Sequence, residues 1–316
     1  MTFVAAIDLG TNSTRLLVCD ADGRELVRRT KITRLGEGLS GTGRLSSDAS
    51  ARVVDTLRAY QVVLDECGVA PGNVRAIATS AARDASNRDE FFDACAAVLG
   101  ARPDLLSGEE EGRLAFAGAT STLEPRRSAF GEDELDLILD IGGGSTEFVV
   151  GVPGQLPIGA ISTDAGCVGF NEKFLDEFDP PGPEALSGAV TVMRAHLEDV
   201  DRELPASKKA TRLVGLAGSV TAVAMIEIGL HTYDRERLHH FVLTREAAED
   251  VFRTVATEKR VDRAANPGLE PDRVDTIVAG ALILVSVMRY FDFAECLVSE
   301  TDILDGVVAE LGLRTR

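Results

Sequence analysis

One short pattern occurs twice in the sequence, and this duplication limits the possible folds more than any other feature. IDLGTNSTRLLV spans residues 7–18, and LDIGGGSTEFVV spans residues 139–150. Asp, Gly, Ser and Thr fall at matching positions with a constant offset, and apolar residues flank both copies. Each copy predicts a strand, a tight turn of small residues and a second strand. Two copies in one chain indicate two related domains.

The segments after each copy predict a mixture of helices and strands. Asp22-Gly23 signals a further hairpin, so the first domain is expected to open with three antiparallel strands. Hydrophobic periodicity then predicts a series of elements in the first domain: helices at about 47–67 and 88–99, strands at 74–79 and 103–106, and a helix that begins near Ser107.

A polar, aperiodic stretch at residues 124–134, which contains Pro125, predicts the domain boundary. The second domain is expected to repeat the opening hairpins and then to become more helical. The predicted domains are residues 1–125 and 126–300, and a last helix at 301–316 is expected to pack back on the first domain.

Composition excludes several classes of function. The net charge of −18 disfavours nucleic acid, whose binding depends on basic side chains that neutralise phosphates. The longest apolar stretch, residues 277–288, is too short to span a bilayer and predicts a buried helix. The five cysteines are dispersed and show no metal-ligand spacing. We therefore expect reduced thiols in a cytoplasmic protein that has no nucleic-acid or membrane partner.

The turn of each repeat is a candidate phosphate site. Glycine lets backbone N–H groups approach an anion, and concave groups of such amides bind phosphate. The structural alternative is a pair of hairpin turns that need glycine for a positive φ. The presence of two matched copies favours phosphate. The predicted phosphate-binding residues are Gly10, Thr11, Asn12, Ser13, Gly142, Gly143, Gly144 and Ser145.

Three carboxylates lie at the ends of these turns, and they are the candidate metal ligands. They are Asp8, Asp140 and Glu147. Carboxylates beside bound phosphate suggest Mg²⁺, which is usually held by few protein oxygens together with waters and substrate phosphates. Stabilisation of the turn by an Asp side chain is the alternative for Asp8 and Asp140, and it is compatible with a metal bound through water.

Two further residues suggest hydrolytic chemistry. Ser107 and Glu110 have the spacing of a capping box, which explains Glu110 but leaves Glu111 without a structural role. A glutamate in the first turn of a helix could deprotonate a water, although a solvated acidic turn is the alternative. Arg83 follows a predicted strand and could clamp a phosphate, although a surface ion pair is the alternative.

At these motifs the sequence resembles the exopolyphosphatase / guanosine pentaphosphate phosphohydrolase family. The resemblance covers essentially the whole chain, and its matching segments are residues 7–18, 34–46, 78–87, 106–116, 139–150, 215–224 and 299–308. It implies an α/β fold of two actin-like (ribonuclease H-like) domains. Each domain would hold a mixed five-stranded sheet with flanking helices, and the ligand would bind in the cleft between them.

The resemblance also implies an activity. The enzyme would hydrolyse the terminal phosphoanhydride of inorganic polyphosphate or guanosine pentaphosphate with Mg²⁺, and it would form a homodimer. Glu111 would be the general base, Glu147 would assist the metal or the water, and Arg83 would hold phosphate.

The preferred substrate and two rival classes of function remain to be considered. Longer relatives carry a C-terminal helical extension that this sequence lacks, which favours short-chain polyphosphate or nucleotide phosphates over processive cleavage of long chains. An actin-like small-molecule kinase would share the phosphate turns, and a non-catalytic polyphosphate or alarmone sensor would share the binding residues. The SGEEEGR segment at 107–113 argues against a kinase, and an intact Glu111 argues against a sensor.

Overall fold

The computed structural model describes residues 2–20 and 22–314, and the chain divides into two compact units. Unit 1 comprises Met1–Gly118 together with Ile303–Arg316, and unit 2 comprises Ala119–Asp302. The domain boundary expected at 125/126 stays a prediction, and residues 315 and 316 of the expected C-terminal segment lie outside the described residues.

Unit 1 is built on a mixed sheet of five strands in the order β3-β2-β1-β4-β5. The first three strands pair antiparallel, while β4 runs parallel to β1 and β5 runs parallel to β4. This confirms the predicted sheet size and the three antiparallel opening strands. The strands are β1 (Phe3–Leu9), β2 (Ser13–Asp20), β3 (Glu25–Ile32), β4 (Val74–Ala78) and β5 (Asp104–Leu105).

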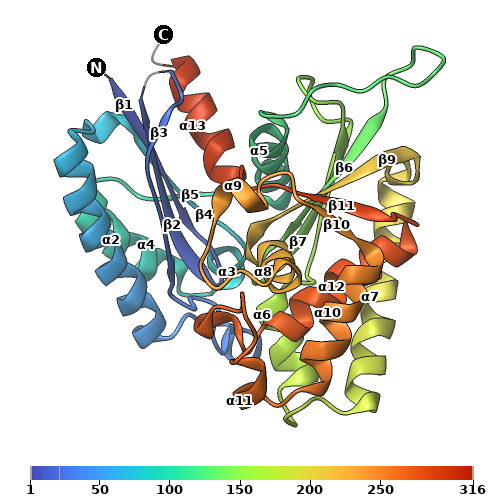
Figure 1. The fold of residues 1–316 in the computed structure, drawn as a ribbon. Coiled ribbons are helices and arrows are strands. Elements are labelled where there is room, and N and C mark those ends of the chain that lie inside the picture. The colour runs from blue at the N-terminus through green and yellow to red at the C-terminus, as the bar shows by residue number, and fades with distance from the viewer. Residues whose placement is uncertain (1, 21, 315–316) are drawn as a thin grey trace. The chain divides into compact units, whose positions relative to one another are not determined.

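Helices cover both faces of this sheet. Figure 1 shows α2 and α4 on one face and α13 on the other. Helix α2 begins where the Ser46 side chain accepts a hydrogen bond from Ala49 N–H, and it ends at Gly68, whose φ of 69° suits glycine. The helices of unit 1 are α1 (Leu39–Thr42), α2 (Ser47–Cys67), α3 (Ser80–Asp84), α4 (Arg88–Leu99), α5 (Gly108–Thr120), whose last residues belong to unit 2, and α13 (Ile303–Arg314), with the 3-10 turn η1 (Pro71–Asn73).

Unit 2 holds a second mixed sheet, in the order β10-β11-β9-β6-β7-β8. Five strands were expected, and the sixth is β10, a three-residue strand at the edge. It escaped prediction because it is too short to show any periodicity before Thr244 caps the next helix. The strands are β6 (Leu135–Ile141), β7 (Thr146–Gly151), β8 (Gly159–Thr163), β9 (Ala210–Leu216), β10 (Val242–Thr244) and β11 (Glu295–Val298).

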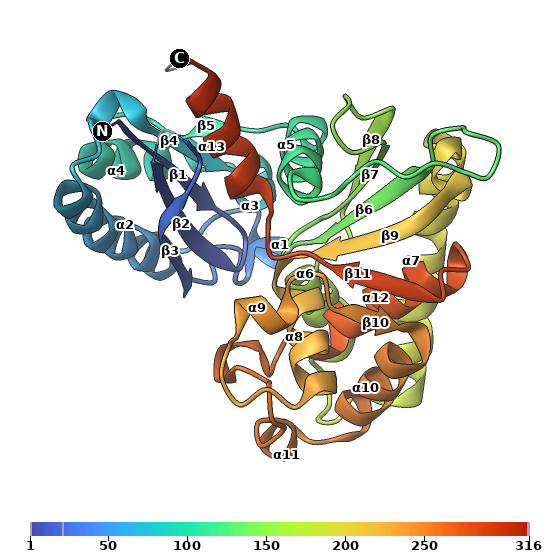
Figure 2. The ribbon, with the colours of Figure 1, turned by 45° about the horizontal axis from the view of Figure 1, so that its top comes forward.

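The core of unit 2 is centred on α12, which packs against α7, α8 and α10 (Figure 2). Most of α12 is buried, as its apolar sequence predicts. Within the described residues no helix is both long and apolar enough to cross a membrane. The helical elements are α6 (Cys167–Phe170), η2 (Asn171–Leu175), α7 (Pro183–Glu203), η3 (Pro205–Lys209), α8 (Ala217–Ile228), α9 (Arg235–Leu238), α10 (Arg245–Thr257), α11 (Arg260–Arg263), η4 (Pro271–Arg273) and α12 (Ile277–Tyr290).

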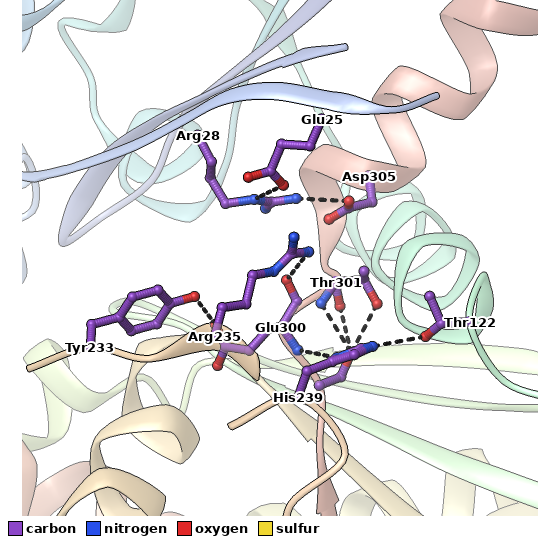
Figure 3. Close-up of polar contacts among 10 residues, drawn as sticks. Glu25, Arg28, Thr122, Tyr233, Arg235, His239, Glu300, Thr301 and Asp305 are labelled. Carbon is purple, nitrogen blue, oxygen red and sulfur yellow. Dashed lines mark hydrogen bonds and ion pairs between the residues drawn. The ribbon is translucent and has the colours of Figure 1, made fainter. Parts of the chain in front are cut away.

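A polar cluster joins the two segments of unit 2 that lead into unit 1 (Figure 3). Thr122 follows α5, and Glu300 precedes α13. The backbone N–H of Glu300 donates to Nδ1 of His239 over 3.1 Å, and Nε2 of His239 lies 3.3 Å from Oγ1 of Thr122. Since Nδ1 accepts, neutral His239 carries its proton on Nε2 and donates it to Thr122. The His240 ring stacks on His239 with 3.9 Å between centroids.

This cluster predicts a loss of stability in acid. Burial, followed by the charges of His240 and Arg235, lowers the pKa of His239 from 6.5 to about 4. Between these values the unfolded chain binds a proton that the folded chain does not, so the free energy of unfolding falls as the pH drops from 6.5 to 4. Because the ring is partly solvated, we expect a contribution of at most about 1 kcal/mol.

Thermal melting at pH 7, 5 and 4 measures this effect. Between pH 7 and pH 4 the melting temperature of the wild type is expected to fall further than that of His239→Gln, whose side chain does not titrate. Parallel losses in the two proteins would show that His239 has no part in the acid sensitivity.

Candidate functional site

The two copies of the repeated segment form the same hairpin turn. The N–H of Gly10 donates to the carbonyl of Ser13 over 3.0 Å, and the N–H of Gly142 donates to the carbonyl of Ser145 over 3.0 Å. A Cβ on Gly10 or Gly142 would lie 3.1 or 3.0 Å from that carbonyl oxygen. No glycine of these turns is among the described residues with a positive φ, so the alternative interpretation of the glycines is wrong. Gly10 and Gly142 instead allow the close approach of this carbonyl oxygen.

The turns present backbone donors. Within the described chain, the N–H groups of Thr11, Asn12, Gly143 and Gly144 donate to no protein acceptor. In the second turn the carbonyl oxygens are held from the other side, where Gly143 accepts from the N–H of Val168 over 2.8 Å. A turn whose carbonyls are bonded and whose amides have no protein acceptor suits an anion.

Gly166 packs directly on the second turn. A Cβ on Gly166 would lie 2.3 Å from both the carbonyl oxygen of Gly143 and the carbonyl carbon of Gly144, so Gly166→Ala must displace the turn. We expect this variant to raise the KM for a phosphate substrate about tenfold, the loss typical of one charge-assisted hydrogen bond. Gly169→Ala is the matched control, because a Cβ there meets nothing within 4 Å. Steady-state kinetics of both variants test this, and equal KM values would contradict it.

The carboxylates beside the two turns lie in different environments. Asp8 stands opposite Arg15 in the β1–β2 register, and Arg15 Nη2 donates to Asp8 Oδ2 over 2.6 Å. At the matching positions of unit 2, Asp140 stands opposite Glu147, and both are buried. Residues directly opposite each other in an antiparallel pair share a face of the sheet. The unit 2 hairpin therefore places two acidic side chains where the unit 1 hairpin places an ion pair.

Two buried carboxylates on one face fit a bound cation. Charges this deep in a protein are costly unless they are paired or coordinate a metal. Ser162 Oγ donates to Glu147 Oε1 over 2.7 Å. Asp140 and Glu147, like Asp8, therefore stay predicted metal ligands. Among the described residues, no group of three or more His, Cys, Asp or Glu side chains forms a ready-made metal site.

The first turn of α5 contains the predicted capping box. The N–H and Oγ of Ser107 both donate to Glu110 Oε2, over 2.9 and 2.8 Å, and Glu110 N–H donates back to Ser107 Oγ over 3.2 Å. These bonds, the backbone one first, lower the pKa of Glu110. Glu111 takes no part in the box, and its side chain is buried instead of solvated.

Arg83 contacts both Glu111 and the backbone just before α5, the helix that carries Glu111. Its Nη1 lies 3.4 Å from Glu111 Oε2 and donates to the carbonyl of Leu106 over 3.0 Å. In the described residues Nε and Nη2 of Arg83 have no acceptor, and the side chain is 27% exposed. The guanidinium can therefore hold Glu111 with one nitrogen and offer two donors to an anion.

The structure adds contacts and residues that the sequence analysis missed. Thr11 Oγ1 accepts from the N–H of Ala81 over 3.2 Å, which ties the first turn to the helix that carries Arg83. In unit 2, the guanidinium of Arg273 lies against Gly218 in the first turn of α8, where a Cβ would meet it at 2.1 Å. Comparison of the two repeats could have identified Arg15, which occupies the position of Glu147, but no local pattern marks Arg273.

Two mixed sheets, each opened by a glycine hairpin and flanked by helices, define the class of the protein as an actin-like α/β fold. The model of the Ppx/GppA phosphatase family matches residues 18–315. The chain belongs to the Ppx/GppA phosphatase family. This confirms the resemblance drawn from the sequence, and with it an enzyme of the phosphohydrolase class.

Relatives of similar length support the assignment. The chain is 35% identical to exopolyphosphatase 2 of Mycobacterium tuberculosis, over 98% of this chain and 99% of that protein. An exopolyphosphatase-like protein of known structure is 32% identical with a TM-score of 0.91, and all of both chains is covered. A Ppx/GppA family member of Aquifex aeolicus is 30% identical with a TM-score of 0.79, over 100% of this chain and 99% of that one.

Proposed function

We propose that the protein is an exopolyphosphatase that removes terminal phosphates from short inorganic polyphosphate, and that Glu111 activates the attacking water. The observation that carries this proposal is the pair formed by Glu111 and Arg83. The carboxylate is buried, has no part in the capping box and lies beside a guanidinium that retains two donors. A base next to an anion clamp is what the attack of water on a phosphoryl group requires.

The water is activated in unit 1. A guanidinium beside a carboxylate favours its charged form, which is the form that accepts a proton. Glu111 takes the proton of the water as its oxygen attacks the terminal phosphorus, and the bond to the bridging oxygen breaks. The free nitrogens of Arg83 stabilise the charge on the phosphoryl oxygens. The products are inorganic phosphate and a chain shorter by one unit.

Each glycine turn would bind phosphate with the backbone amides of its own unit. The amides of Gly143 and Gly144 donate to substrate oxygens, and the turn at residues 10–13 contributes in the same way. These donors recognise any linear phosphoanhydride, so guanosine pentaphosphate is a second substrate under this proposal. Under this proposal both substrates bind through their phosphates, and no side chain needs to recognise the guanine base.

Asp140 and Glu147 of unit 2 would hold Mg²⁺. Asp8 of unit 1 pairs with Arg15, so this carboxylate would contact an ion only through water. When bound, the ion would neutralise charge on the phosphates and on the leaving group. We further propose a cytoplasmic homodimer. The five cysteines are all free thiols, which suits a reducing compartment.

Phosphate release in the presence of Mg²⁺ tests the proposal, with short polyphosphate, long polyphosphate, guanosine pentaphosphate and ATP as substrates. Release from short polyphosphate without any acceptor is expected to be fastest. Turnover that needs ATP and an acceptor hydroxyl would indicate the kinase alternative. Tight binding without release would indicate the sensor alternative.

A further inference from the structure

Ion pairs near both ends of helix α13 connect it to the rest of unit 1. It packs on β1 and β2. Near its start, Arg28 of β3 donates to Asp305 over 2.8 Å, and Glu25 holds the same guanidinium over 2.9 Å (Figure 3). Near its end, Glu310 pairs with Arg75 and Arg113, as described below. The helix therefore has a fixed position on the sheet of unit 1.

One of these ion pairs reaches the helix that carries Glu111. Arg113 lies two residues after Glu111 on α5, and its Nη1 lies 2.6 Å from Glu310 Oε1. Glu310 is also 2.8 Å from Arg75, which pairs with Asp104 just before α5. Burial alone would raise the pKa of Glu310, but the guanidinium groups of Arg113 and Arg75 together lower it below its usual value.

The two helices approach each other closely at Gly306. A Cβ on Gly306 would lie 2.1 Å from the carbonyl oxygen of Leu114 and 2.9 Å from its carbonyl carbon. Both are backbone atoms of α5, so no side chain could move aside to admit a methyl group. Leu114 lies one helical turn after Glu111, on the same side of α5. Glycine weakens a helix, so its presence at this position is explained by the close approach.

We propose that Gly306 is a positioning residue for the hydrolytic reaction: by letting α13 press against α5 at Leu114, it sets the direction in which Glu111 points. The inference rests on the proposed role of Glu111 as the base. A substitution at Gly306 pushes α5 away from α13 while the ion pairs of Asp305 and Glu310 hold α13 in place. Glu111 then moves, because it lies a single turn from the point of contact.

The primary test compares Gly306→Ala with Gly312→Ala, a matched change on the same helix where a Cβ meets nothing within 4 Å. Displacement of a catalytic group by about 1 Å costs roughly a hundredfold in rate, so we expect kcat of Gly306→Ala to fall about 10- to 100-fold. The KM should change little, because Glu111 does not bind the substrate tightly. Gly312→Ala should keep the wild-type kcat.

A second comparison separates positioning from general damage. In a Glu111→Gln background the base is already lost, so Gly306→Ala should lower the remaining rate no further. An equal fold-loss in both backgrounds would overturn the inference, as would a wild-type kcat for Gly306→Ala. If Glu111→Gln alone keeps wild-type turnover, the proposed base is wrong and the inference falls with it.

Glu310→Gln keeps the test decisive if Gly306→Ala does not fold. It removes the charge that holds Arg113 and Arg75 but adds no atom to the helix contact. A fall in kcat that disappears in the Glu111→Gln background supports the positioning role. An unchanged kcat for a folded Glu310→Gln protein would overturn it.

Discussion

Glu111→Gln is expected to lower the rate of phosphate release by about 10²- to 10⁴-fold, the usual contribution of a general base. Glutamine has nearly the same shape and can still accept a hydrogen bond from Arg83, but it cannot take a proton from water. The capping box formed by Ser107 and Glu110 is untouched, so the helix should remain folded.

Single-turnover kinetics and equilibrium binding of a short polyphosphate measure this effect. Binding is expected to stay within a few-fold of wild type, because the glycine turns carry it. Glu110→Gln is the control: glutamine can still accept the hydrogen bonds from Ser107, so both the cap and the chemical step should be retained. Loss of turnover in Glu110→Gln to the same extent as in Glu111→Gln would indicate damage to the helix and not loss of a base.

Asp140→Asn is expected to raise the Mg²⁺ concentration needed for half-maximal activity at least about tenfold, in line with other losses at metal sites. Asp140 and Glu147 lie opposite each other and are buried, so removal of one charge leaves a single carboxylate for a divalent ion. Turnover at saturating Mg²⁺ should also fall, because charge on the phosphates is less well neutralised.

The repeat supplies the control for this prediction. Asp8 occupies the same position in the unit 1 hairpin, but its carboxylate is paired with Arg15. Asp8→Asn should therefore leave the Mg²⁺ requirement close to that of wild type. Titration of activity and direct calorimetry with Mg²⁺ distinguish the two variants. A larger shift for Asp8→Asn than for Asp140→Asn would place the metal at the other hairpin.

Much of the fold could be predicted because its elements carry strong local signals. The predicted helices at 47–67 and 88–99 coincide with α2 and α4, since each ends at a glycine that adopts a left-handed conformation. The capping box likewise placed the start of α5 within one residue. Edge strand β10 could not be predicted, since a three-residue strand is fixed by its pairing with β11 and not by its own sequence.

The residue types of the candidate site could be predicted from the sequence, but the contacts that each residue makes could not. The repeat indicated the two turns and places Arg15 at the position of Glu147, but the ion pair between Arg15 and Asp8 is shown by the structure. The contacts of Gly166 and Gly306 involve backbone atoms distant in sequence, and such contacts leave no local pattern. A glycine with an ordinary φ is explained only by the neighbouring atoms that occupy the place of a Cβ.

The most direct test of the central claim is hydrolysis of a short polyphosphate in ¹⁸O-labelled water, with Mg²⁺ and no acceptor, by wild type and Glu111→Gln. We predict that the wild type releases phosphate carrying one ¹⁸O atom, and that the variant binds the chain but releases about a hundredfold less in the same time. Equal release by the two proteins, or phosphate transfer that appears only when an acceptor is added, would contradict a water activated by Glu111.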